Sequence, residues 1–396
     1  SAASDVYKRQ VHLWVCDQTE KTNDTFEDYG LFTQVEQLNK TALKAHGLDK
    51  SGHLYKVNSF DFHRFEDTIK LTDDPDYNQT AFEGMLEIKG DSDHTKLIEM
   101  LDALNDDTQK IDDVLDTYFD TENLVYWMAF QILTGNCDTQ NRNCYLYSPL
   151  NSKVWYILDW DNDGMLRKFE LSLTGFSDYA SWERGVSNYW GNVLFNRALR
   201  SKSFRRELDS AVKDLRSYLT EERLSKMVEH YHEVTEPLVF AAPDLEHLPV
   251  TKDEYEQIAA AIPSEIKENY QSFRESYKKP MPFYIGVPQI ENGKLRVNWD
   301  AAYDFEARDI RYTVELARDY AITDVIFKAE DVLLPEVTCD APDTGQYFVR
   351  VRATNSDGYT QDAFDYYVTD DGKQYGMKCF YVQDGGKVVE DTYEEG

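Results

Sequence analysis

The stretch DTENLVYWMAFQILTGN (120–136) constrains the fold most strongly, because it is apolar on nearly every side from Leu124 to Leu133. The Asp-Thr pair at its start is typical of a helix N-cap. A helix without a polar face belongs inside a core, and this one is too short to cross a bilayer. We therefore expect a buried helix around which a domain packs.

Amphipathic and alternating segments on both sides of this helix predict an α+β fold. Helices are predicted at 36–47, 94–105 and 111–119, and as a polar-faced helical run over 191–280. Strands are predicted at 11–16, 30–35, 51–58, 144–148 and 154–160, with the first two forming a hairpin. The last two strands are joined by the polar turn PLNSK.

From about residue 283 the pattern changes to short alternating strands with regular turns, which is typical of an all-β sandwich. The runs L-x-V-x-W, ending at Trp299, and Y-x-V-x-V-x-A, starting at Tyr347, resemble fibronectin type III domains. That resemblance implies that Trp299 fills the inter-sheet core and that Tyr347 anchors a corner. We place this domain at 283–370 and predict a partly disordered acidic tail at 371–396.

Charge and composition exclude several classes of partner. Forty-two basic and 73 acidic side chains give a formal charge of -31, which repels the phosphates of nucleic acids. No apolar run is long enough for a membrane span. Five cysteines without any C-x-x-C support neither a zinc site nor a disulfide framework.

His230 and His232 are two positions apart on a predicted helix, so they face different directions and are expected to be solvated.

The first ten residues, SAASDVYKRQ, resemble the translated adapter sequence found at the ends of metagenomic reading frames. We therefore set residues 1–10 aside from fold prediction. The expectation is that the natural protein begins further upstream.

The segment DWDNDGMLRKFE (159–170) raises the question of a metal ion. It satisfies the calcium-loop pattern, with Asp159, Asp161 and Asp163 at alternate positions before a glycine, and Glu170 as the last ligand. An EF-hand, however, needs a helix before its loop, whereas VWYIL is β-branched and aromatic. A calcium site is therefore the weaker of two alternatives.

The stronger alternative is a phosphoryl-transfer site. Asp138 and Asn143 have the D-x-x-x-x-N spacing of the catalytic loop of protein kinases. The order is also that of a kinase: buried helix, Asp loop, Asn, strand, turn, strand and metal-binding Asp. A hard cation with bound phosphates takes oxygen ligands from separate segments, and a β-hairpin brings two segments together.

The motifs GNCDTQNRNCYLY (135–147) and WYILDWDND (155–163) resemble those of the CotH family, the spore coat protein H type of atypical protein kinases. The likeness covers about residues 11–280 and implies a kinase-like fold with a partial N-lobe and a helical C-lobe. It implies that Asp138 is the catalytic aspartate and that Asn143 and Asp161 bind the metal. Asp163 is expected to be a further metal ligand.

By the same resemblance, the segment VEQLN (35–39) lies where kinases bind adenine, so Glu36 and Gln37 are candidate cofactor-binding residues. The implied cofactors are ATP and Mg²⁺, with Mn²⁺ as an alternative metal. The implied substrate is a Ser or Thr hydroxyl of a secreted or surface protein, at the outside of a bacterial cell.

Two departures from the kinase pattern bear on activity. Asn136-Cys137 replaces the His-Arg pair before the catalytic aspartate, and Asp159 stands where the family commonly has proline. A phosphate-binding lysine is expected ahead of the first hairpin, where only adapter-like residues occur, so we expect impaired ATP turnover. The alternative from another class is a non-catalytic surface scaffold or adhesion protein with a degenerate kinase-like domain.

Overall fold

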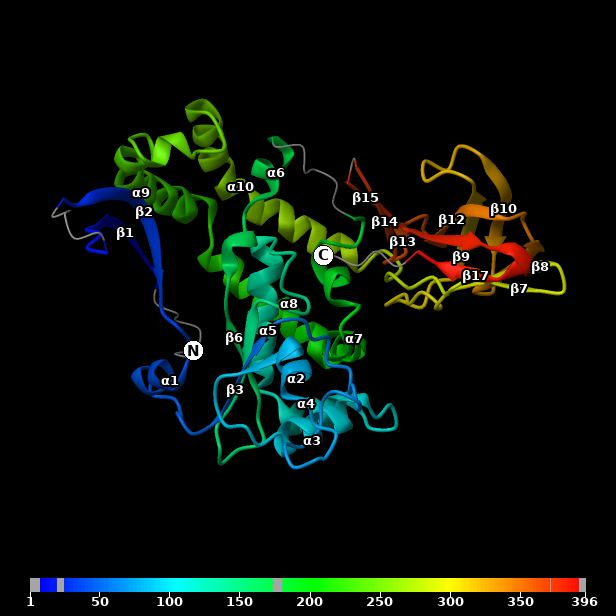
Figure 1. Cartoon of the computed structure of the whole chain (residues 1–396), viewed down its shortest axis with the longest axis horizontal. Helices are drawn as coiled ribbons and strands as arrows, with labels where there is room; N and C mark the ends of the chain where they lie inside the picture. The colour runs from blue at the N-terminus through cyan, green and yellow to red at the C-terminus, as the bar shows by residue number, and fades with distance from the viewer. Residues whose placement is uncertain (1–7, 20–24, 174–179, 371, 392–396) are drawn as a thin grey trace. The chain divides into compact units, whose positions relative to one another are not determined.

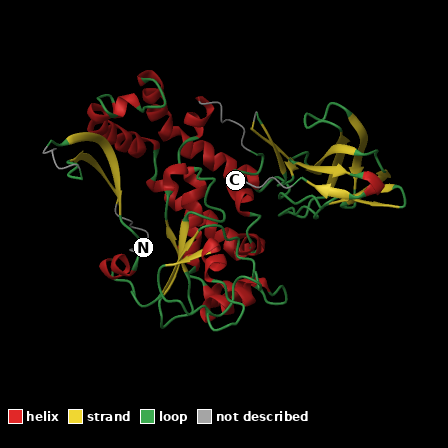
Figure 2. Cartoon of the chain, in the orientation of Figure 1, coloured by secondary structure: helices red, strands yellow, loops and turns green. Residues whose placement is uncertain are grey.

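The computed structural model describes residues 8–19, 25–173, 180–370 and 372–391. The chain divides into two compact units. The first contains residues 1–174 and 192–269, and the second contains residues 175–191 and 270–396. Helices make up most of the first unit and strands most of the second (Figure 2). The predicted α+β class, with an all-β carboxyl-terminal region, is confirmed.

The elements of the first unit are labelled in Figure 1. Its strands are β1 Lys8–Val15, β2 Glu27–Val35, β3 His53–Val57, β4 Leu86–Ile88, β5 Cys144–Ser148 and β6 Tyr156–Asp159. Its helices are α1 Lys40–Ala45, α2 Gln79–Met85, α3 Thr95–Asn105, α4 Ile111–Tyr118, α5 Thr121–Thr134, α6 Lys168–Leu173, α7 Val193–Arg200, α8 Lys202–Tyr218, α9 Glu221–Val239 and α10 Lys252–Ser276, the last of which continues into the second unit. No helix in the described ranges is long and apolar enough to cross a lipid bilayer.

Helix α5 is the buried helix that the sequence predicts. The Asp120 carboxylate caps it by accepting the backbone N–H of Asn123 at 2.8 Å. Its side chains are buried against α8 and β6, and Trp127 stacks on Phe195 of α7 with ring centroids 5.7 Å apart. A helix without a polar face thus forms the centre of the first unit.

Helix α5 also fixes the edge of the neighbouring sheet. Strands β4, β3, β5 and β6 form an antiparallel sheet in that order, with β6 at one edge. The Asn123 side chain donates to the carbonyl of Ile157 at 3.1 Å and accepts the N–H of the same residue at 2.8 Å. Because both backbone groups of an edge residue are satisfied, strand β6 is held against α5 just before its last residue, Asp159.

The β1–β2 hairpin is anchored beside α9 (Figure 1). The N–H of Leu31 donates to both carboxylate oxygens of Asp244, each at 3.1 Å. Gly30 has φ +81°, and a Cβ on it would lie 2.3 Å from Asp244 Oδ2, so the close approach requires glycine. Strand β1 includes residues 8–10, three of the ten that we set aside; residues 1–7 lie outside the described residues.

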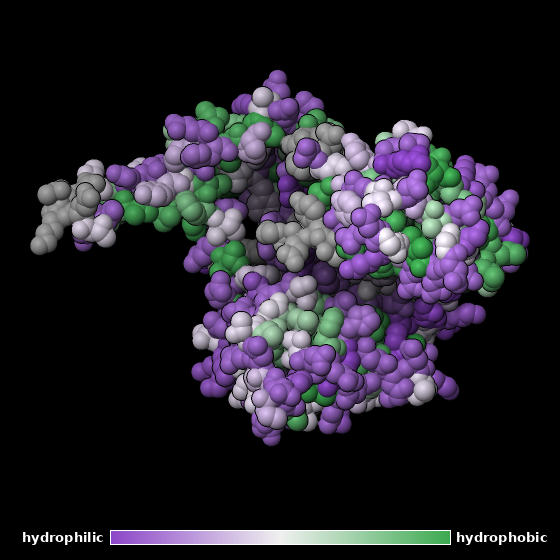
Figure 3. Space-filling view, turned by 45° about the vertical axis from the view of Figure 1, so that its right-hand side comes forward, coloured by the Kyte–Doolittle hydropathy of each residue, from purple (hydrophilic) through white to green (hydrophobic). Residues whose placement is uncertain are grey.

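This hairpin also carries exposed aromatic side chains. Trp14, Phe26, Tyr29 and Phe32 are each about half exposed, and Figure 3 shows hydrophobic surface along the hairpin. In the described residues, β1 and β2 pair only with each other. The hairpin is therefore attached to the unit through α9, through Asp244 and through its connection to α1, and not as part of a larger sheet.

A buried histidine joins β3, α2 and α3. The His94 ring is fully buried and stacks on Phe82 with centroids 4.0 Å apart. Its Nδ1 lies 2.9 Å from the Tyr55 hydroxyl and its Nε2 3.1 Å from the Tyr77 hydroxyl. Burial lowers the pKa of His94 to about 4, although the nearby Asp93 carboxylate acts in the opposite direction. The folded chain therefore holds this ring neutral.

Stability should consequently fall in mild acid. His94 has an ordinary pKa of 6.5 when unfolded, so the unfolded chain binds the proton more readily. Its contribution is complete above pH 6.5 and is lost as the pH falls toward 4, by about 2 kcal/mol at pH 5. Urea unfolding of the natural chain and of His94→Gln, above pH 6.5 and at pH 5, measures this effect. A natural chain whose pH dependence equals that of His94→Gln would contradict the assignment.

The second unit is built from strands. They are β7 Gln289–Glu291, β8 Lys294–Asn298, β9 Ile310–Ala317, β10 Val325–Val332, β11 Glu336–Asp340, β12 Gly345–Asn355, β13 Thr360–Asp362, β14 Tyr366–Thr369, β15 Gly372–Tyr375, β16 Met377–Val382 and β17 Val388–Glu390. The larger sheet has the order β10-β9-β12-β16-β17, with β13 on β12, and a second sheet has the order β11-β8-β7. Trp299 is buried in their shared core against Tyr312, and the Tyr347 hydroxyl donates to the Asp343 carbonyl at 3.0 Å. Both side chains have the expected roles, while the type III identity stays a prediction.

The structure differs from the sequence analysis at the end of the chain. The segment 371–396, predicted as a partly disordered acidic tail, contains β16, which lies between β12 and β17 in the larger sheet. Phe380 and Val382 of this strand are buried in the core. Met377 and Cys379 are buried in a second cluster, so both faces of the strand are covered, and the acidic composition around it concealed this apolar run. Residues 392–396 lie outside the described residues.

Candidate functional site

Two polar loops leave the same end of the β5–β6 hairpin. In the ladder Cys144 pairs with Asp159, so the neighbouring residues Asn143 and Trp160 emerge at one end. Asn143 and Asp161 have φ values of 57° and 55°, which turn the chain sharply out of both strands. The predicted hairpin therefore brings the Asp138–Asn143 loop and the loop after Asp159 to one place.

The two loops are in direct contact. A short 3-10 turn, Asn162–Gly164, follows Asp161. A Cβ on Gly164 would lie 2.8 Å from Asn136 Oδ1 and 3.8 Å from the Cβ of Asp138. Glycine at this position allows the second loop to pack directly on the first, which puts the segment carrying Asp161 against the segment carrying Asp138.

Asp138 is oriented by its own loop. Its Oδ2 accepts the side-chain amide of Asn143 at 2.9 Å, and its Oδ1 pairs with Nε of Arg142 at 3.0 Å. The Asp138 and Arg142 side chains are both half exposed, so this ion pair is weak. Because Asn143 uses its amide nitrogen toward Asp138, its amide oxygen is the atom that can bind a metal.

Asp159 has a structural role that the sequence analysis missed. Its carboxylate accepts the side-chain amide of Gln131 at 2.6 Å and that of Asn162 at 2.7 Å. Gln131 is fully buried in α5, and the oxygen of Asn162 faces the amides of Gln131 and Asn136 at 3.3 and 3.4 Å. This network holds the second loop, while Asp161 and Asp163 are exposed. The available signal was Gln131, which interrupts the apolar stretch from Leu124 to Leu133 of α5.

The loop after Asp159 does not have the arrangement of an EF-hand. Strand β6, not a helix, leads into Asp159. Glu170, the expected last ligand, lies on α6 and is paired with Arg167 by two hydrogen bonds of 2.9 and 3.0 Å. The pattern match lacked the helix that the motif requires.

A buried thiol lies next to the first loop. Cys144 follows Asn143 directly and is the first residue of β5, where it pairs with Asp159. Burial, with the Asp159 carboxylate nearby, raises the pKa of the Cys144 thiol. This cysteine therefore stays protonated and serves packing rather than nucleophilic chemistry.

Helix α10 anchors the segment that follows the second loop. The Glu265 carboxylate, which is almost fully buried, accepts the backbone N–H groups of Lys168 at 3.2 Å and Phe169 at 3.0 Å. These groups begin α6, so Glu265 caps that helix from another element. The Asn269 side chain donates to the carbonyl of Leu133 at 3.0 Å, which joins α10 to α5.

Removing this cap should destabilise the first unit. Glu265→Ala leaves two backbone N–H groups without their acceptor and is expected to cost about 2 kcal/mol. The matched control is Glu268→Ala on the same helix, which removes a half-exposed ion pair to Lys168 and should cost about 0.5 kcal/mol or less. Chemical denaturation of both variants provides the measurement. Equal losses for the two variants would contradict the capping role.

The predicted adenine-binding segment is fixed to the sheet beside the site. Glu36 and Gln37 lie between β2 and α1, as expected, and the Glu36 carboxylate is 2.7 Å from Nε2 of His46. The next residue, Leu38, is buried in a cluster that includes Leu158 of β6 and packs against Trp160. Segment 36–39 therefore lies near the strand end from which Asp161 follows.

His232 does not have the environment expected from sequence. It was predicted to be solvated, but its imidazole lies between the carboxylates of Glu236 and Glu256. As the two-residue spacing predicts, His230 does not share this environment, because its side chain is exposed. Glu236, four residues further along α9, was a signal in the sequence, whereas Glu256 on α10 required the tertiary structure.

Comparison with known proteins bears on what these loops do. The family model described as CotH kinase protein matches residues 11–273, which is most of the chain. The chain belongs to the CotH kinase family. Comparison of this CotH chain with curated proteins gave no match.

A comparison with solved structures adds little. This CotH chain is similar to the twitchin kinase region from C. elegans at 17% identity, over 24% of this chain and 20% of that one. The TM-score is 0.19, so the likeness carries no argument. The match spans a fifth of that solved chain.

Proposed function

We propose that this CotH chain transfers the γ-phosphate of ATP, with Mg²⁺, to a Ser or Thr hydroxyl of a protein. The observation that carries the proposal is the contact of Gly164 with Asn136 and Asp138, since it joins the two loops that a kinase site requires. Membership of the CotH kinase family supports the reaction class. A surface or secreted bacterial protein is the substrate class we propose.

The residues at the two loops fit a hard divalent cation. Asn143, Asp161 and Asp163 offer amide and carboxylate oxygens, which Mg²⁺ prefers, and Mn²⁺ accepts the same donors. When bound, the ion neutralises charge on the phosphates of ATP. Asn143 and Asp161 are the main ligands that we propose, with Asp163 as a further one. The Gln131–Asp159–Asn162 network keeps the Asp161 loop in position.

Asp138 orients the acceptor. Its carboxylate accepts the proton of the substrate hydroxyl, whose oxygen forms a bond to the γ-phosphorus as the bond to the leaving ADP oxygen breaks. The hydrogen bond from Asn143 fixes the Asp138 carboxylate within its own loop, next to the proposed metal ligand Asn143. Displacing the weak Arg142 pair gives the substrate access to one carboxylate oxygen. Positioning and electrostatics supply the rate enhancement.

The adenine ring is assigned to the segment after β2. We propose that backbone groups of Glu36 and Gln37 bind it, because Leu38 fixes this segment to the cluster that includes Leu158. The Glu36 side chain itself is directed to His46, so it is the backbone, not the carboxylate, that is proposed to contact the base.

Nucleotide binding can be tested without knowledge of the substrate. Mg-ATP at about 100 times its Kd should raise the free energy of unfolding by about 2.7 kcal/mol. The measurement is chemical denaturation with Mg-ATP, with Mg²⁺ alone and with ATP in excess EDTA, of which only the first should stabilise the chain. If Mg-ATP has no effect, the chain is instead a scaffold with a degenerate kinase-like domain.

A further inference from the structure

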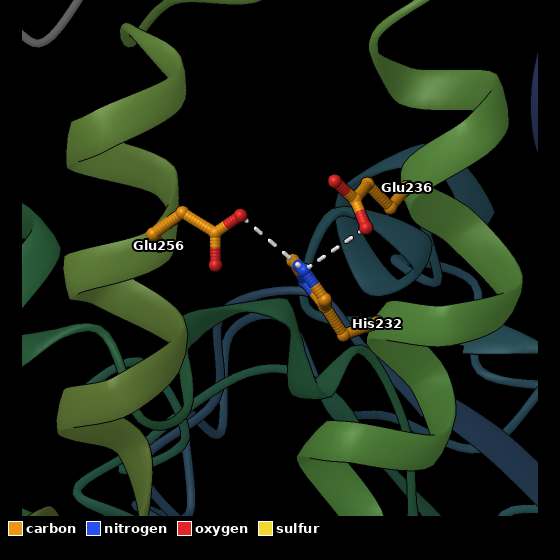
Figure 4. Close-up of side chains that lie close together, drawn as sticks. All are labelled: His232, Glu236 and Glu256. Carbon is orange, nitrogen blue, oxygen red and sulfur yellow. Dashed lines mark ion pairs between the residues drawn. The ribbon is translucent and has the colours of Figure 1, made fainter.

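Helices α9 and α10 bring three potential metal ligands together, away from the two loops. His232 and Glu236 are four residues apart on α9 and therefore share one face of that helix. Glu256 faces them from α10 (Figure 4). One ligand atom from each residue lies within 4.8 Å of the other two. This is the one such group of His, Cys, Asp or Glu side chains in the described ranges.

The distances between His232 Nε2 and the two carboxylates are longer than hydrogen bonds and suit ligands around one ion. Nε2 of His232 is 3.5 Å from Oε2 of Glu236 and 3.4 Å from Oε1 of Glu256. An N–H···O hydrogen bond is shorter, at about 2.7–3.2 Å. A tetrahedral Zn²⁺ site with bonds of about 2.0–2.1 Å places its ligand atoms about 3.4 Å apart. Both separations from Nε2 agree with the latter value.

The surroundings orient these ligands. The Lys252 ammonium donates to Oε1 of Glu236 at 2.9 Å, which leaves Oε2 directed at His232. The His232 ring packs against Tyr255 with centroids 5.6 Å apart, and its Nδ1 is buried without a hydrogen-bond partner, so ring packing and not a hydrogen bond orients the imidazole. Figure 4 shows the imidazole directed into the space between the two helices. Two carboxylates and one ammonium leave a net negative charge, which attracts a cation.

We propose that His232, Glu236 and Glu256 bind one divalent transition-metal ion, with Zn²⁺ as the fitting example and water as the fourth ligand. One imidazole and two carboxylates suit Zn²⁺ or Co²⁺, whereas Mg²⁺ prefers oxygen ligands alone. This site is separate from the proposed ATP site and does not depend on it.

The ion links two elements that support the phosphoryl-transfer loops. Helix α9 leads into the short 3-10 turn Asp244–Glu246, whose first residue anchors the β1–β2 hairpin through Leu31. Helix α10 carries Glu265, which caps α6. Joining α9 to α10 at His232 therefore stiffens the connection between the hairpin and the segment after the second loop.

Titration with metal alone tests the site. Metal-free chain titrated with CoCl₂, without nucleotide or Mg²⁺, should show the visible absorption of tetrahedral Co²⁺, and calorimetry with ZnCl₂ should give one high-affinity ion per chain. His232→Ala should lose the absorption band and the high-affinity Zn²⁺ isotherm. The matched control is His230→Ala, which removes an exposed imidazole two residues away and should retain both.

Two further measurements separate this site from others. Glu256→Gln should also lose the Co²⁺ band, and thermal unfolding in EDTA shows whether each variant is folded. Binding through Cys16 or Cys137, which are partly exposed, would produce thiolate-to-cobalt charge transfer and would persist in His232→Ala. The proposal is overturned if the natural chain binds no Zn²⁺, or if His232→Ala and His230→Ala bind it equally. Neither result bears on ATP binding.

Discussion

Asp161→Asn should remove Mg-dependent ATP binding. The substitution replaces a carboxylate by an amide of the same size at the residue proposed as a main metal ligand, so the ion loses a charged partner. Calorimetry with Mg-ATP should show an affinity at least about 100-fold lower, which corresponds to about 2.8 kcal/mol. Folding stability should change by about 0.5 kcal/mol or less, because Asp161 is exposed.

The control for this experiment is Asp116→Asn. Asp116 is also exposed but lies on α4, outside the two loops. Asp116→Asn removes the same formal charge as Asp161→Asn. Any general effect of the net charge of -31 on nucleotide affinity therefore appears in both variants. Equal losses of ATP affinity in the two variants would show that Asp161 has no specific role.

Asp138→Asn should separate catalysis from binding. The amide keeps the size of the side chain but cannot accept the proton of the acceptor hydroxyl, so phosphoryl transfer should fall by about 10²–10⁴-fold. Affinity for Mg-ATP should stay near that of the natural chain, because Asp138 is not proposed as a metal ligand. Transfer of radiolabelled phosphate to a generic protein substrate, with calorimetry in parallel, measures both quantities.

Arg142→Gln provides the matched control for Asp138. It breaks the same ion pair as Asp138→Asn but leaves the carboxylate in place. Phosphoryl transfer by this variant should therefore remain much closer to that of the natural chain. If Arg142→Gln loses phosphoryl transfer to the same extent, the loss comes from breaking the ion pair and not from removing the proton acceptor.

Much of the first unit could be predicted because local pattern and tertiary environment agree there. Helix α5 has no polar face to expose, and the polar turn between β5 and β6 leaves one pairing for the two strands. The proximity of the Asp138 loop to the Asp161 loop follows from that pairing. The roles assigned to Asp138, Asn143, Asp161, Asp163, Glu36 and Gln37 stay predictions.

The remaining features depend on contacts between distant residues. The Asp159 carboxylate looked like a metal ligand because nothing local shows that Gln131, 28 positions earlier, already binds it. Strand β16 was hidden by acidic neighbours, although its pairing with β12 buries Phe380. The approach of His232 to Glu256 joins two helices whose relative placement no periodicity specifies.

The most direct test of the central claim is a crystal structure of the chain with Mn²⁺ and a non-hydrolysable ATP analogue. Manganese is located by its anomalous scattering and takes the oxygen ligands that Mg²⁺ takes. The account predicts an anomalous peak bound by the Asn143 amide oxygen and the Asp161 carboxylate, next to the analogue's phosphates. A nucleotide bound elsewhere, or bound phosphates with no anomalous peak in contact with Asn143 or Asp161, would contradict it.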